Sequence, residues 1–226
     1  MKSLDRLERK FGKFAIRGLM IYITTGNLAV FLLDYLMPSL NLPLKLMLIP
    51  SLVLKGEVWR LITYIFIPPN TNIIFILFVI YFYYMIGSTL EHEWGSFKLT
   101  VYYLLGMIGT TIAAFFTGGS SSTYLNLSLF LAFAYLFPDF EILIFFILPV
   151  KIKYLAWLNW AFIVFTIVFG DIRLKIAAIV QVANFFLFFG SDLLKWIKSR
   201  RNVYYNRKNF FRQIEEGRKA NKQNRR

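Results

Sequence analysis

Long apolar runs alternate with short polar segments along most of this chain. A helix needs about 20 apolar residues to cross the hydrocarbon core of a bilayer, and lipid offers the backbone no partners outside its own helix. The pattern predicts an all-α integral membrane protein with six transmembrane helices, the fourth short and enclosed by the others. The expected spans are Gly18–Met37, Asn72–Leu90, Phe97–Thr117, Thr123–Phe137, Tyr154–Gly170 and Leu174–Leu194.

Two apolar stretches do not fit this pattern. The segment Pro38–Thr71 contains four prolines and scattered charges, so it is too broken to span. We interpret it as a long first loop embedded in the outer membrane interface, with short amphipathic helices anchored by Trp59 and Tyr64. The segment Glu141–Lys153 is interpreted as an apolar run interrupted by Pro149 and closed by two lysines at the cytoplasmic interface.

Composition agrees with a membrane protein, and the charge distribution adds a topology. Hydrophobic residues make up 58% of the chain and charged residues 17%, which excludes a soluble globular domain. The net charge of +14 lies in residues 1–17 (+4) and 195–226 (+10), whereas residues 18–194 are neutral. Basic residues next to spans stay in the cytoplasm. We therefore expect a basic N-terminal segment, a membrane domain over 18–194 and a basic tail, with both termini cytoplasmic, in a bacterial plasma membrane.

Few residues are available for metal or acid-base chemistry. The chain has no cysteine and a single histidine, His92. This excludes disulfides and thiolate metal sites, and we expect no metal and no cofactor.

The basic tail has two interpretations. It begins at the membrane, where each basic residue gains about 1 kcal/mol from anionic lipid, so the lipid bilayer is its expected partner. Aromatic residues among its arginines and lysines would also suit RNA or an acidic protein. Nucleic acid is the less favoured partner because the charge is explained by topology.

Three motifs lie in order along the chain. The first is Gly56-Glu57-Val58-Trp59-Arg60-Leu61-Ile62-Thr63 in the first loop, and the second is Leu90-Glu91-His92-Glu93-Trp94-Gly95 after the second span. The third is Leu136-Phe137-Pro138-Asp139 at the end of the fourth span. Over residues 15–192 this arrangement resembles the rhomboid superfamily. The resemblance implies a six-helix core with a membrane-embedded first loop.

The same resemblance implies a chemistry that this sequence does not support. Active rhomboids are intramembrane serine proteases that use a serine in G-x-S-G on the fourth span and a histidine on the sixth. Here the matching stretch keeps Ser128 without either glycine, and the sixth span has no histidine. A serine hydroxyl without a base in reach is a poor nucleophile. His92 lies at the opposite membrane face, on the order of 15 Å away.

We therefore expect a catalytically inactive, Derlin-like rhomboid relative that binds or remodels membrane-protein clients or lipid, with Ser128 as a vestige. Two alternatives remain: an intramembrane serine protease in which Ser128 uses an unconventional base, and a small transporter or channel. Trp59 and Arg60 either pin the first loop or disturb the bilayer, and Glu91 is expected to cap the loop after the second span. The polar residues Asn126, Gln181 and Asn184 either bond between helices or mark a groove for a client or lipid.

Overall fold

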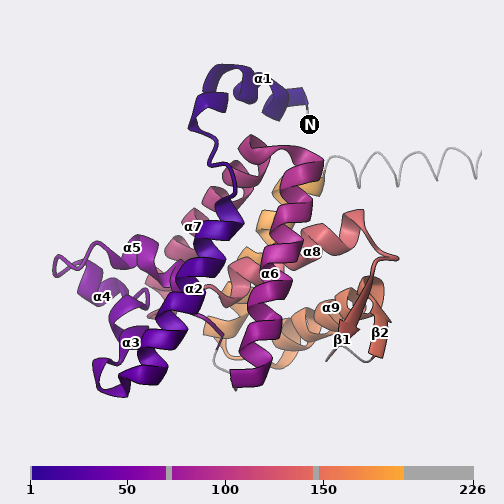
Figure 1. Ribbon diagram of the computed structural model, residues 1–226. Coiled ribbons are helices and arrows are strands. Elements are labelled where there is room, and N and C mark those ends of the chain that lie inside the picture. The colour runs from indigo at the N-terminus through magenta and orange to yellow at the C-terminus, as the bar shows by residue number, and fades with distance from the viewer. Residues whose placement is uncertain (1, 70–72, 145–147, 191–226) are drawn as a thin grey trace, which may run out of the picture. The chain divides into compact units, whose positions relative to one another are not determined.

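Helices form most of the computed structural model, which describes residues 2–69, 73–144 and 148–190 (Figure 1). Five of the described helices are long and apolar enough to cross a membrane. They are α2 (Leu19–Leu36), α6 (Ile73–Trp94), α7 (Ser96–Thr117), α9 (Ile152–Phe169) and a last helix, Ile172–Gly190. A sixth apolar helix, α8 (Thr123–Leu136), has 14 residues. The chain is thus a multi-pass helical membrane protein.

The contacts of the chain group residues up to Phe185 into one compact unit, and residues from Phe186 onward into a second. The second unit is described only at 186–190, where it continues the last helix. The expected basic tail, 195–226, lies outside the described residues.

Helix α8 is the innermost helix of the first unit. It packs against α6, α7 and α9, and nine of its residues are buried on all sides of the helix, from Leu125 to Ala134. At 1.5 Å per residue, 14 residues reach only about 21 Å, less than the hydrocarbon thickness of about 30 Å. A short helix is tolerated here because protein, rather than lipid, surrounds most of its length.

The first loop is folded into short helices, as its prolines and charges predict. It contains η2 (Pro38–Leu40), α3 (Leu42–Leu46), α4 (Pro50–Val53), α5 (Arg60–Thr63) and η3 (Tyr64–Phe66). The loop packs against α2 through α3 and η3. Tyr64 is fully buried, so it anchors the loop in the protein rather than in the lipid interface.

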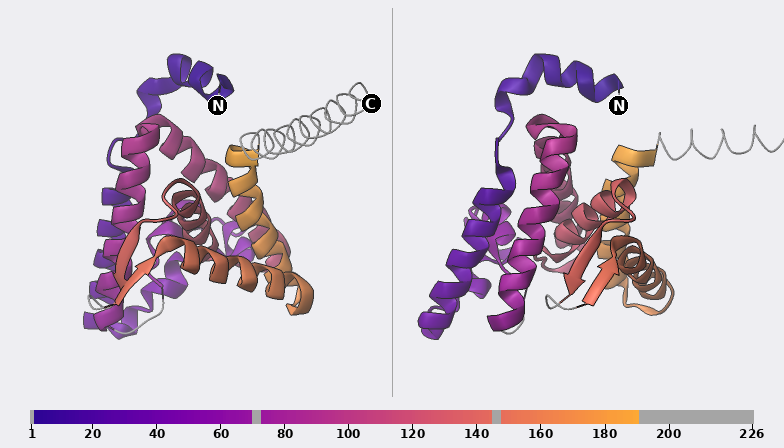
Figure 2. Two further views of the ribbon diagram at one scale, coloured as in Figure 1. Left: turned by 90° about the vertical axis from the view of Figure 1, so that its right-hand side faces the viewer. Right: turned by 45° about the vertical axis from the view of Figure 1, so that its right-hand side comes forward.

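The expectation of an all-α fold is wrong at residues 141–151. Strands β1 (Glu141–Ile144) and β2 (Leu148–Lys151) pair in an antiparallel hairpin, with Glu141 opposite Lys151 (Figure 2). Pro149 cannot donate a backbone hydrogen bond and disfavours a helix. Pairing within the hairpin satisfies the backbone groups on the facing edges of the two strands without a helix.

The N-terminal basic segment forms two further short helices, α1 (Lys2–Phe11) and η1 (Gly12–Phe14). A salt bridge of 3.7 Å from Lys98 Nζ to Glu8 Oε2 joins α1 to α7. Leu7, Phe11 and Phe14 are nevertheless more than 40% exposed.

Helices α2 and α6 run side by side in every view and approach each other at Gly87 (Figures 1 and 2). A Cβ atom added at Gly87 would clash with Met20, whose own Cβ atom would be 2.8 Å away. Met20 is itself 1% exposed, so it has little space in which to move. The helix pair therefore depends on the missing side chain.

We predict that Gly87→Ala destabilises the protein by about 1–3 kcal/mol through overpacking, seen as a lower thermal unfolding midpoint in detergent. Met20→Ala should restore part of the loss when combined with Gly87→Ala. Gly12→Ala is the matched control, because the nearest atom to its new Cβ is 3.9 Å away. Equal midpoints for Gly87→Ala and Gly12→Ala would contradict the tight approach.

Candidate functional site

Arg60 holds the first loop together from inside. Its side chain is 5% exposed, and its Nε atom donates to Glu57 Oε2 at 2.6 Å. One terminal nitrogen of the guanidinium donates to the backbone oxygens of Leu44 at 2.7 Å and Met47 at 2.8 Å. These carbonyls lie at the end of α3, where helical hydrogen bonds are no longer available. Arg60 therefore caps α3 and pairs its own charge.

Other members of this motif surround Arg60. Thr63 donates to the backbone oxygen of Leu46 at 3.1 Å, which satisfies another carbonyl at the end of α3. Gly56 lies in an exposed turn with φ +107°. Trp59 is 51% exposed, so it projects from the loop that Arg60 organises.

The second motif joins three segments at the end of α6. Glu91 Oε1 accepts from the Gly18 backbone N–H at 2.8 Å and from Ser96 Oγ at 2.6 Å. Glu91 therefore ties the start of α2 to the turn between α6 and α7, which is more than the expected loop cap. Gly95 forms that turn with φ +85°, a conformation that favours glycine.

Trp94, in the same motif, is buried and packs against α7. Its ring is 7% exposed, and its centroid lies 5.6 Å from that of Tyr102. His92 is an exposed residue in the last turn of α6.

Ser128 is fully buried and is held by two neighbours. Its Oγ atom lies 2.6 Å from the Tyr102 hydroxyl, and Asn184 Nδ2 donates to it at 3.2 Å. The Tyr102 hydroxyl also lies 2.8 Å from the Ser128 backbone oxygen. Among the described residues, Ser128 Oγ thus has a phenol and a carboxamide as partners, and no imidazole, amine or carboxylate. Neither partner is a general base near neutral pH.

The three polar residues expected within spans are all buried, and each has different surroundings. Asn184 contacts Ser128, in space that Gly106 leaves open: a Cβ atom there would be 2.9 Å from Asn184 Nδ2. Gln181 Nε2 lies 3.5 Å from Asn159 Oδ1 on α9. Asn126 is 3% exposed, and its Oδ1 atom has no hydrogen-bond partner in the part of the chain described.

Further buried polar groups were not expected from the sequence. Tyr102 and Tyr103 are 0% and 1% exposed, and Tyr64 lies 3.3 Å through its hydroxyl from the Met107 backbone oxygen. Asn27 on α2 is 1% exposed, and neither of its amide atoms has a partner among the described residues. The position of Asn27 within an apolar run was the one feature of the sequence that could have indicated a buried amide here.

The hairpin borders an apolar groove of about 230 Å³ next to α6. Its walls are aromatic and aliphatic side chains with Glu141 at the rim; they include Phe78, Tyr81, Phe82, Met85, Phe140, Ile142 and Leu143. At the base of the hairpin, Lys153 Nζ donates to Asp139 Oδ1 at 2.7 Å. That bond and the positive charge of Lys153 hold the pKa of the Asp139 carboxyl below its usual range.

The fold and these interactions define a multi-pass helical membrane protein whose polar residues mainly join helices and loops. A family model described as "Eukaryotic integral membrane protein (DUF1751)" matches residues 17–191. The chain therefore belongs to that family. No curated protein matches it.

The family overturns one expectation from the sequence. A bacterial plasma membrane is wrong, because the family consists of eukaryotic integral membrane proteins. Hydropathy and charge identify spans and their orientation, and neither depends on the kind of cell.

We predict that Arg60→Gln destabilises the first loop by about 2–3 kcal/mol, because the carbonyls of Leu44 and Met47 lose a charge-assisted donor and Glu57 loses its ion pair. Chymotrypsin should then cut the loop faster in detergent, and the thermal unfolding midpoint should fall. Lys45→Gln, which removes an exposed cation from α3, is the matched control and should leave both unchanged. A wild-type cleavage rate for Arg60→Gln would show that the loop does not depend on this residue.

Proposed function

We propose that this chain is a catalytically inactive rhomboid-like membrane protein that binds or remodels membrane-protein clients or lipid. One observation carries the proposal: the hydroxyl of Ser128 is buried and occupied by Tyr102 and Asn184. A nucleophile must reach the substrate and transfer its proton to a base. Ser128 meets neither requirement in this arrangement.

A six-span topology is part of the proposal. If α8 crosses as the fourth span, the described residues contain six spans, and an even number of spans places both termini on one face. The basic residues at both ends favour the cytoplasmic face. The residues Gly56–Thr63 and Leu90–Gly95 carry the resemblance to rhomboids. The first segment bonds to the end of α3 through Arg60, and the second bonds to the start of α2 through Glu91.

The first loop supports a role in disturbing the bilayer. Arg60 fixes the loop from inside, while Trp59 and its neighbour Val58 are 51% and 60% exposed. A rigid loop with apolar side chains on its outside can occupy the interface and thin the lipid around it. This is the behaviour attributed to the W-R motif of Derlins.

The groove beside α6 supports client binding. Exposed apolar surface is ordinary in a membrane protein, whereas a groove offers a helix more contact than lipid does. Tyr81 on α6 and Leu143 on β1 are 56% and 50% exposed at this groove. A transmembrane segment of a client would therefore contact α6 and the hairpin from the lipid side. Helix α9, which packs on α8 and β2, also leaves most of its residues exposed.

We predict that the wild-type protein and Ser128→Ala cleave a transmembrane reporter equally, at the background of empty membranes. The reason is that removing an oxygen that does no chemistry leaves the rate unchanged. An active rhomboid protease in the same assay shows that the reporter can be cut. Cleavage that depends on Ser128 would establish the serine-protease alternative instead.

We also predict that a photoreactive residue at Tyr81 crosslinks to membrane-spanning proteins in native membranes. The matched control is the same residue at Tyr22, which is 65% exposed on α2 and lies outside the groove. Mass spectrometry of the products should find partners enriched at position 81. The same partners in equal yield at both positions would indicate collisions in the bilayer rather than a client groove.

A further inference from the structure

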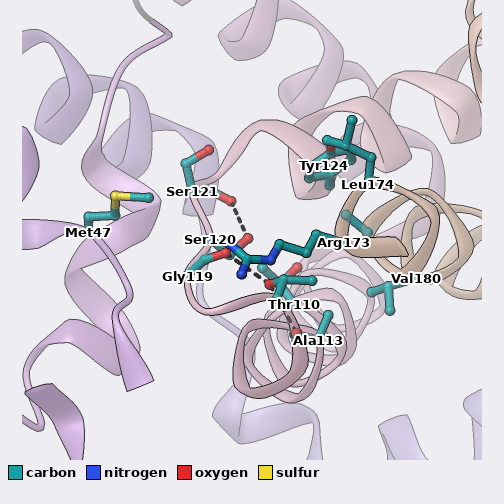
Figure 3. Close-up of a pocket in the computed structure, with 12 residues that line it drawn as sticks. Met47, Thr110, Ala113, Gly119, Ser120, Ser121, Tyr124, Arg173, Leu174 and Val180 are labelled. Carbon is teal, nitrogen blue, oxygen red and sulfur yellow. Dashed lines mark hydrogen bonds between the residues drawn. The ribbon is translucent and has the colours of Figure 1, made fainter. Parts of the chain in front are cut away.

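A cavity lies between the end of α7, the start of α8 and the start of the last helix (Figure 3). We propose that it binds the phosphate of a phospholipid headgroup, with Arg173 as the principal ligand. This inference is independent of whether the groove beside α6 binds protein clients.

The walls of the cavity come from segments far apart in the sequence. Its volume is about 220 Å³, and it lies beneath the loop 118–122 between α7 and α8. That loop is fixed on both sides: Ser120 N donates to the Leu48 backbone oxygen at 2.9 Å, and Ser122 Oγ donates to that of Ile67 at 3.0 Å. At Gly109, an added Cβ atom would be 3.1 Å from Val180, so α7 and the last helix close together there. The cavity is therefore part of the packed structure.

One end of the cavity is polar and positively charged. Of the described residues that line it, Arg173 is the one charged residue. Figure 3 shows its side chain extending from the last helix toward Ser120 and Gly119. Within the described part of the chain, its guanidinium makes no hydrogen bond or ion pair, and the Asp171 carboxylate accepts from the Arg173 backbone N–H at 3.4 Å. The guanidinium is thus available to a ligand.

The position of Arg173 favours an anion. It lies in the first turn of the last helix, Ile172–Gly190, where the helix dipole disfavours a cation and stabilises an anion. An arginine there adds to the positive potential instead of balancing it. The planar guanidinium fits two phosphate oxygens at once. Ser120, Ser121 and Tyr124 line the same cavity, where a hydroxyl can donate to a further phosphate oxygen. In the structure the Ser120 hydroxyl donates to the Ser121 backbone oxygen at 3.3 Å, and the Ser121 hydroxyl lies 3.0 Å from Thr123 Oγ1.

The depth and the other walls favour a lipid as the source of the phosphate. Three apolar helices begin or end at the cavity, which places it where a bilayer carries its headgroups. Apart from Thr110 and Thr117, the remaining walls are apolar, from Met47, Ala113, Leu174, Ala177 and Val180. A volume of about 220 Å³ is below the 300–1,000 Å³ of sites that enclose a drug-sized ligand. It suits a phosphate and the glycerol beside it, with the acyl chains outside in the bilayer.

The test is a titration of the purified full chain in detergent, with bound lipid counted by native mass spectrometry. The probe is dioleoyl phosphatidic acid. Dioleoylglycerol keeps the chains without the phosphate, and glycerol 3-phosphate keeps the phosphate without the chains. We expect phosphatidic acid to bind at least tenfold more tightly than either.

Two variants locate the binding. Arg173→Gln should weaken phosphatidic acid binding about tenfold, the effect of losing one charge-assisted contact of about 1.4 kcal/mol. Ala177→Leu should weaken it by filling the cavity while leaving the charge unchanged. Lys55→Gln is the control, because it removes an exposed cation from the first loop, away from the cavity. Residues 195–226 are the same in every variant, so lipid that they attract contributes equally to all.

Equal thermal midpoints for all four proteins will show that each variant is folded. If Arg173→Gln is not folded, Arg173→Lys takes its place; it loses the planar guanidinium and should bind phosphatidic acid more weakly than the wild type. Wild-type affinity in folded Arg173→Gln would overturn the proposal. So would equal binding of dioleoylglycerol, which needs no phosphate. Equal binding of glycerol 3-phosphate would overturn the assignment to a lipid.

Discussion

The first loop depends on the guanidinium of Arg60, which donates to backbone carbonyls in a segment made of very short helices. Prolines break the segment between α2 and α6 into helices of three to five residues, and such helices leave most of their terminal groups unpaired. Near hydrocarbon each unpaired group costs several kcal/mol. Arg60 donates to two of these carbonyls, and Glu57 neutralises its charge. The carbonyls thus gain a donor, and the buried guanidinium gains acceptors.

The same principle explains the inside of the bundle. Helix α8 is too short to meet lipid at both ends, and it is buried on all sides. Its polar side chains must therefore bond to other helices, as Ser128 does to Tyr102 on α7 and to Asn184 on the last helix. Ser128 thus joins three helices. Its hydroxyl is held by the packing that would have to open for any substrate to approach.

The sequence predicted the apolar helices well, because length and hydropathy decide whether a segment can lie in a bilayer. It also located the short α8 and the broken first loop. Long-range pairing was beyond it: Glu91 bonds to Gly18, 73 positions away, and nothing local marks that partner. The hairpin was missed because an apolar run with a single proline fits an interfacial segment as well as paired strands. The burial of Asn27 was missed because one amide in an apolar run carries no sign of which way it faces.

The two loops that frame the cavity are connected to each other, and this links the separate sites. Ser120 and Ser122 bond to the backbone of Leu48 and Ile67, which lie on either side of the segment that Arg60 organises. A change in the first loop would therefore move the loop that lines the cavity together with Arg173. If the first loop responds to the thickness of the bilayer, the cavity responds with it. The loop at the membrane surface and the site for a headgroup then act as one structural unit, built from residues that the apolar pattern alone would treat as unrelated.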